Sequence, residues 1–115
     1  ARVATFMNAF NVVDGVPATG NAYLQRDILK QKWNYKGMVV SDWGSIGEMV
    51  PHGFAADLKE AAHLAVNAGS DMDIEAAAYV TYLEALVKEG KVKEATINDA
   101  VRRILRLKFR LGLFD

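Results

Sequence analysis

The chain has 115 residues, enough for one domain with a modest hydrophobic core, and we expect residues 1–115 to form a single domain. The formal net charge is zero, from 14 basic and 14 acidic residues, so the composition favours neither a nucleic-acid partner nor an anionic membrane surface. No apolar run approaches the about 20 residues of a membrane span, and the absence of cysteine excludes disulfides and thiolate catalysis and leaves the compartment unknown.

The first third of the chain predicts a strand, a loop and a helix. Residues 3–10 are apolar and β-prone apart from Asn8, which predicts a strand. Residues 11–20 are rich in glycine, proline and aspartate, which predicts a loop. From Asn21 to about Trp33 the apolar residues recur at helical spacing, which predicts a helix.

A second strand follows this helix. Residues 34–37 break the helix, and we expect Gly37 to provide a positive φ or a close approach between backbones. Residues 38–41 form a short apolar run between turn residues, the pattern of a strand buried in a parallel sheet. The loop expected over residues 43–54 is longer than the about 2–6 residues usual after such a strand, and extra length there indicates function.

The second half of the chain predicts three helices and one more strand. They are a helix from Asp57 to about Asn67 closed by Gly69, a strand over 70–74, a helix over 76–88 closed by Gly90, and a helix that opens at the capping-box variant 96–99 and ends at Gly112. The alternation of strands and helices predicts right-handed βαβ units with a parallel sheet.

Asp42 is the first candidate for chemistry, because it follows the second strand directly. In parallel α/β folds the carboxyl ends of the strands are where ligands bind. Trp43 beside it offers an aromatic face for a sugar ring, and such a pair suits attack on an anomeric carbon. The spacing alone fits other roles equally: Asp42 as a helix N-cap or an aspartate bonded to backbone amides, and Trp43 as a core residue that shields the loop.

Six short blocks of sequence, taken in their order along the chain, indicate a family resemblance. They are residues 6–11 (FMNAFN), 14–18 (DGVPA), 37–44 (GMVVSDWG), 68–73 (AGSDMD), 101–105 (VRRIL) and 111–114 (LGLF). At these spacings they resemble glycoside hydrolase family 3, the β-glucosidase family, over nearly the whole chain. The resemblance implies an α/β fold of parallel βα units, the last three strands of a (β/α)8 TIM barrel, or an open α/β layer derived from it.

The resemblance also implies the site. Asp42 matches the family's nucleophile, which attacks the sugar and forms a covalent glycosyl-enzyme. Trp43, Phe10 and Met7 match positions near the sugar, although core packing is an equally good explanation of Met7. The family works without a cofactor, and we expect no metal site.

The general acid/base that a retaining mechanism needs is not assigned to this chain. Asp71, Asp73, Glu48 and Glu75 could lie on the same sheet edge as Asp42. The family's acid/base residue, however, lies in a later region, beyond this C-terminus. We interpret Asp71 and Asp73 as structural.

The sequence therefore predicts a portion of a retaining β-glucosidase-like hydrolase that acts on a β-glucoside or a related sugar. Three βα units do not close an eight-stranded barrel, so we expect the chain to be inactive until missing barrel strands, or further copies of itself, complete it. The alternative is an excised or engineered non-catalytic α/β module that self-associates through its exposed barrel edges.

Overall fold

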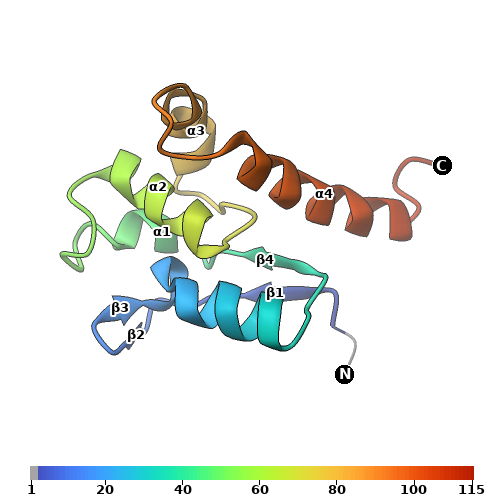
Figure 1. The fold of residues 1–115 in the computed structure, drawn as a ribbon, viewed down its shortest axis with the longest axis horizontal. Coiled ribbons are helices and arrows are strands. Elements are labelled where there is room, and N and C mark those ends of the chain that lie inside the picture. The colour runs from blue at the N-terminus through green and yellow to red at the C-terminus, as the bar shows by residue number, and fades with distance from the viewer. Residues whose placement is uncertain (1–2) are drawn as a thin grey trace.

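A computed structural model describes residues 3–115 as a mixed α/β fold (Figure 1); residues 1 and 2 of the expected domain lie outside this description. The elements in chain order are β1 (Thr5–Met7), β2 (Val12–Val13), β3 (Val16–Pro17), η1 (Ala18–Gly20), η2 (Tyr23–Lys32), β4 (Met38–Val40), α1 (Ser45–Glu48), α2 (Leu58–Ala68), α3 (Ala78–Lys88) and α4 (Glu94–Arg110).

The sheet that the sequence predicts is present but small. β1 and β4 pair in parallel, with Thr5 opposite Met38 and Met7 opposite Val40, and helix η2 lies between them in the chain. This is the βαβ unit expected from the alternation. Figure 1 shows α4 running beside β4 and extending past it toward the C-terminus.

The prediction of a third strand over residues 70–74 is wrong, because this segment forms no continuous strand. A single parallel bridge joins Val40 to Met72. The ladder stops there because a side chain replaces the next backbone partner: the hydroxyl oxygen of Ser41 accepts a hydrogen bond from the N–H of Ile74 at 2.8 Å. The coarse prediction of a parallel α/β fold holds, and its completion as a barrel remains a proposal.

The N-terminal region contains more structure than a loop. β2 and β3 form a two-stranded antiparallel hairpin where the sequence predicts only a loop. Asp14 and Gly15 turn this hairpin with φ values of 49° and 80°, the left-handed conformation that suits a tight two-residue turn. The predicted strand over 3–10 shrinks to β1, although the N–H of Asn8 still bonds to the carbonyl of Val40 at 3.0 Å.

One predicted helix is of a different type, and one helix occurs where the sequence predicts a loop. η2 lies where a helix is predicted, but it is a π-helix; the N–H of Trp33 reaches the carbonyl of Ile28, five residues earlier, at 2.9 Å. Apolar spacing does not distinguish this wider helix from an α-helix. The expected loop 43–54 also contains the short helix α1.

Helix ends set by local chemistry were predicted well at α2 and poorly at α4. Asp57 caps α2 by accepting the N–H of Glu60 at 2.8 Å, and Gly69 ends it with φ 112°. The capping box at 96–99 is wrong, because α4 begins at Glu94 and its N-cap, Lys93, has no side-chain cap. Glu94 lies in the first turn, where its negative charge favours the positive end of the helix dipole.

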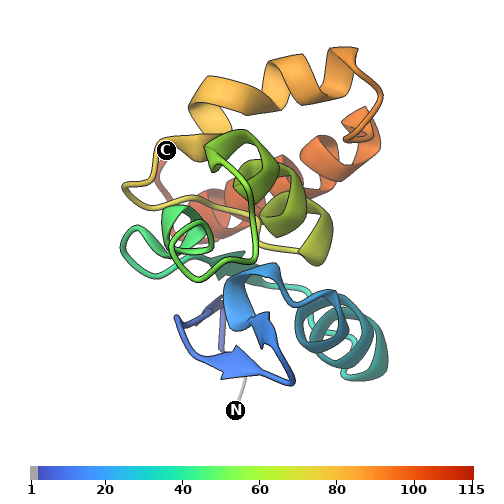
Figure 2. The same cartoon turned by 90° about the vertical axis from the view of Figure 1, so that its left-hand side faces the viewer.

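The core is built where α1, α2 and α3 meet, a group that gathers at one end of the molecule (Figures 1 and 2). Alanines of α2 allow close approach of the other helices, and the larger buried side chains fill the space between them. These larger side chains are Ile46, Met49, Leu86 and Val92. Among residues 3–115, every helix is too short or too polar to span a membrane.

Candidate functional site

The site begins at Gly37, which lets β4 start close to β1. A Cβ atom at Gly37 would lie 2.3 Å from the carbonyl oxygen of Ala4 and 2.2 Å from the hydroxyl of Tyr35. Gly37 has no positive φ, so the close approach, rather than the unusual backbone conformation, is what requires glycine here.

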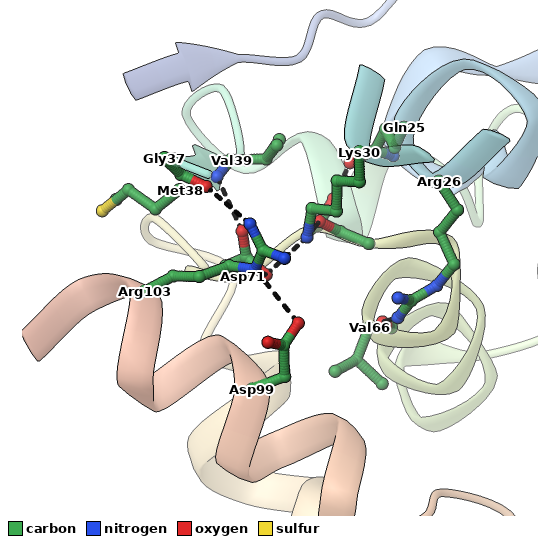
Figure 3. Close-up of polar contacts among 12 residues, drawn as sticks. Gln25, Arg26, Lys30, Gly37, Met38, Val39, Val66, Asp71, Asp99 and Arg103 are labelled. Carbon is green, nitrogen blue, oxygen red and sulfur yellow. Dashed lines mark hydrogen bonds and ion pairs between the residues drawn. The ribbon is translucent and has the colours of Figure 1, made fainter. Parts of the chain in front are cut away.

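A buried ion cluster fixes β4 from the side of η2 and α4 (Figure 3). Asp71 lies 2.7 Å from the ammonium of Lys30 and accepts the N–H of Val39, inside β4, at 2.8 Å. Lys30 also donates to the carbonyl of Gly69 at 2.7 Å. Burial lowers the pKa of Lys30 from its usual value, and the charge of Asp71 opposes this shift.

Arg103 of α4 completes this cluster and holds the segment before β4. It donates to the carbonyls of Gly37 at 3.0 Å and Tyr35 at 3.3 Å, and to the carboxylate of Asp99 at 3.0 Å. Partial burial opposes ionisation of Asp99, but the hydrogen bond and charge of Arg103 prevail and lower its pKa. Cations from two helices therefore position the strand that leads to Asp42.

A second polar network joins the end of β1 to the start of α1. The hydroxyl oxygen of Thr19 lies 3.0 Å from both the carboxamide oxygen of Asn8 and the hydroxyl of Ser45. The amide of Asn8 donates to Ser70 at 2.7 Å, and Ser70 in turn lies 3.0 Å from the carboxamide oxygen of Gln25. Sequence reasoning missed this network, since its members are far apart in the chain and individually resemble ordinary polar residues.

Asp42 lies in the turn that these networks support. One of its carboxylate oxygens accepts the N–H of Trp43 at 2.7 Å, and no other protein hydrogen bond to this carboxylate occurs among residues 3–115. The turn is tied to the neighbouring segment, because the N–H of Gly44 bonds to the carbonyl of Ile74 at 2.9 Å. The helix N-cap alternative is wrong, since Gly44 is the N-cap of α1, whereas the bond to a backbone amide is present.

The other predicted site residues are exposed to different degrees. Trp43 is 68% exposed, which contradicts the alternative of a core residue that shields the loop. Met7 is 61% exposed in this chain. The sheet register places Met7 beside Val40, two residues before Asp42. Phe10 is half-buried, and no stacking or hydrogen bond among the described residues joins it to Asp42 or Trp43.

The remaining acidic residues divide into structural and exposed groups. Asp71 belongs to the ion cluster, and Asp73 accepts the N–H of Tyr79 at 3.1 Å near the start of α3, in agreement with structural roles. Glu48 lies 3.8 Å from His52 on the surface. Glu75 is exposed. Within residues 3–115 no group of three or more histidine or acidic side chains is arranged to hold a metal ion.

Comparison with known proteins gives a consistent result. The family model described as "Glycosyl hydrolase family 3 N terminal domain" matches residues 1–107. A periplasmic β-glucosidase of Salmonella typhimurium is 43% identical over 95% of this chain, and a putative β-xylosidase of Formosa agariphila is 37% identical over all of it. The chain spans only 14% and 15% of these relatives, respectively.

Solved structures agree with the sequence relatives. The β-glucosidase from Listeria innocua in complex with glucose matches 94% of this chain with a TM-score of 0.92 and 45% identity, and the match covers 15% of that protein. The same Listeria protein has also been solved with isofagomine.

Proposed function

Because this chain belongs to glycoside hydrolase family 3, we propose that it forms the part of a retaining β-glucosidase-like enzyme that carries the nucleophile, Asp42. The geometry of the Asp42 turn carries the proposal. The turn follows the central parallel strand, is fixed by backbone and side-chain bonds, and leaves one carboxylate oxygen without a protein partner among residues 3–115.

In this mechanism the carboxylate of Asp42 attacks the anomeric carbon while the glycosidic bond breaks. The leaving oxygen takes a proton from a general acid, and water later releases the sugar from Asp42 with that acid now acting as base. The two carboxyl groups of a retaining enzyme lie about 5–5.5 Å apart. We propose that the acid comes from another part of the complete enzyme.

Trp43 and Met7 suit the binding of a sugar next to Asp42. Both are exposed apolar side chains close in the chain or in the sheet register to the Asp42 turn, and an indole face stacks well on a sugar ring. Phe10 follows β1 by three residues, and we propose that it borders the same subsite. The glucose complex of the Listeria innocua relative supports a β-glucoside or a near relative as the substrate.

The two sides of the β1–β4 sheet are open, and we propose that other segments of the complete barrel cover them. On the β1 side a hollow of about 330 Å³ is lined by apolar side chains that include Leu24 and Ile28. On the opposite side, next to Met72 and Ile104, lies a second hollow of about 400 Å³. We propose that neighbouring strands and helices of the barrel cover the first hollow at Leu24 and Ile28 and the second at Met72 and Ile104. Met7 and Glu75, which also line these hollows, then stay open to the substrate. We propose that the chain alone does not turn over substrate.

A chimera tests this proposal. The segment of the Listeria innocua β-glucosidase that matches this chain is replaced by the chain, and hydrolysis of a nitrophenyl β-glucoside is measured with Asp42 and with Asp42→Ala. We expect activity that is lost in Asp42→Ala, and none from the isolated chain. Equal activity with and without the carboxylate would refute the assignment of Asp42. Exposed Glu84→Ala on α3 serves as the matched control, with unchanged activity.

A further inference from the structure

Glu75 stands out because its backbone is held in a conformation that glutamate rarely adopts. Its φ is 76°, in the left-handed region, and Ala77 two residues later has φ 54°. Such a conformation is unfavourable for a residue with a Cβ atom, and it persists where the surrounding structure enforces it, commonly beside functional sites. Glycine would satisfy both positions without this strain.

The surrounding bonds place Glu75 next to the Asp42 turn. The N–H of Ile74 is bound by the hydroxyl of Ser41, and the carbonyl of Ile74 accepts the N–H of Gly44. Glu75 follows Ile74 directly, so its backbone has little freedom to move away from that turn. Segment 73–75 and the Asp42 turn thus form one rigid rim.

The side chain of Glu75 points back over this rim. Its Oε2 atom lies 3.2 Å from the position that a Cβ atom on Gly44 would occupy, and Gly44 directly follows Trp43. Glu75 is exposed, and no hydrogen bond or salt bridge to its carboxylate is present among residues 3–115. A charged acceptor is therefore available at the edge of the surface formed by Trp43.

We propose that Glu75 is a specificity-determining residue that accepts hydrogen bonds from hydroxyl groups of the leaving sugar. The inference rests on the proposed function of the Asp42 turn and adds the class of leaving group to it. A carboxylate binds sugar hydroxyls through charge-assisted hydrogen bonds, which are stronger than neutral ones. A nitrophenyl leaving group has no hydroxyl to donate. Glu75 thus favours disaccharides over aryl glucosides.

The test compares laminaribiose, a disaccharide bound in one structure of a Listeria innocua β-glucosidase variant, with a nitrophenyl β-glucoside in the Listeria innocua chimera. We expect Glu75→Ala to lower kcat/KM for laminaribiose by about tenfold or more, the usual effect of losing a hydrogen bond to a charged group, and to leave the nitrophenyl glucoside nearly unchanged. Glu75→Gln, which keeps an acceptor but not the charge, loses less. If the whole chimera does not fold, residues 72–77 of this chain are placed alone into the Listeria innocua enzyme. The Glu75 variants are then compared on the same two substrates there.

A matched pair of glycine variants separates binding from backbone strain. Glu75→Gly and Ala77→Gly both relieve a left-handed residue, so both should raise the melting temperature. Only Glu75→Gly should lose activity toward laminaribiose. Equal effects on the two substrates, or no effect on laminaribiose while the nitrophenyl glucoside is hydrolysed, would refute the role of Glu75. Loss of all hydrolysis in a parent chimera that folds, as judged by its melting transition, would instead refute the proposed function.

Discussion

Replacing Asp71 by alanine tests whether the buried ion cluster holds β4 in place. The carboxylate is 4% exposed, lies 2.7 Å from Lys30, and accepts the N–H of Val39. Without it, the ammonium of Lys30, itself only 6% exposed, loses its ionic partner, and the N–H of Val39 loses its acceptor. Removal of one partner from a buried pair costs about 3–5 kcal/mol.

This loss is large beside the about 5–15 kcal/mol by which a typical domain is stable. With a urea dependence of about 2 kcal/mol per molar, the unfolding midpoint falls by about 2 M. Circular dichroism during urea unfolding of the chain measures the shift. Asp71→Asn keeps an acceptor for Val39, and the double variant Lys30→Met with Asp71→Asn removes the uncompensated charge, so it should recover part of the loss.

The exposed pair Lys88 and Glu84 on α3 provides the matched control. Lys88→Ala should leave the unfolding midpoint unchanged, because solvent screens an exposed ion pair. If Asp71→Ala changes the midpoint as little as Lys88→Ala does, then the cluster does not support β4, and the physical account of how the Asp42 turn is positioned fails with it.

Three further predictions concern backbone contacts and alkaline pH. Gly37→Ala should destabilise the chain by about 1–3 kcal/mol in urea unfolding, since its Cβ would overlap the carbonyl of Ala4; an unchanged midpoint would contradict the close approach. Ser41→Ala should cost about 1–3 kcal/mol by leaving the N–H of Ile74 without its acceptor, and faster amide hydrogen exchange at that N–H checks this. Burial, with the charges of Asp73 and Asp71, raises the pKa of Tyr79 well above its usual value. The folded chain thus keeps a proton that the unfolded chain loses near pH 10, so stability should fall above this pH, and Tyr79→Phe should show a smaller fall.

The parts of the fold that depend on neighbouring residues were predictable from sequence. Asp57 and Gly69 bound α2 as expected, because a cap and a left-handed glycine act within one turn. The apolar run of β4 predicted a strand of a parallel sheet, and β4 pairs in parallel with β1. The block ending in Asp42 and Trp43 also predicted the family, which the comparisons confirm.

The remainder depends on contacts between distant residues. The ladder beyond Val40 ends because the side chain of Ser41 binds Ile74, 33 residues away, and no local pattern reports this. Thr19 joins Asn8 and Ser45 through side chains that would equally suit a surface. Apolar spacing likewise did not distinguish the π-helix η2 from an α-helix. The left-handed Glu75 was not predictable, because the sequence places glutamate where glycine would signal such a backbone.

The most direct test of Asp42 as the nucleophile is to locate the covalent intermediate. The chimera is treated with a fluorinated glucoside whose glycosyl-enzyme breaks down slowly, then digested, and the labelled peptide is sequenced by mass spectrometry. We expect a single sugar attached to the carboxylate of Asp42 and no labelling in Asp42→Ala. A sugar attached to another residue, with Asp42 unmodified, would contradict it.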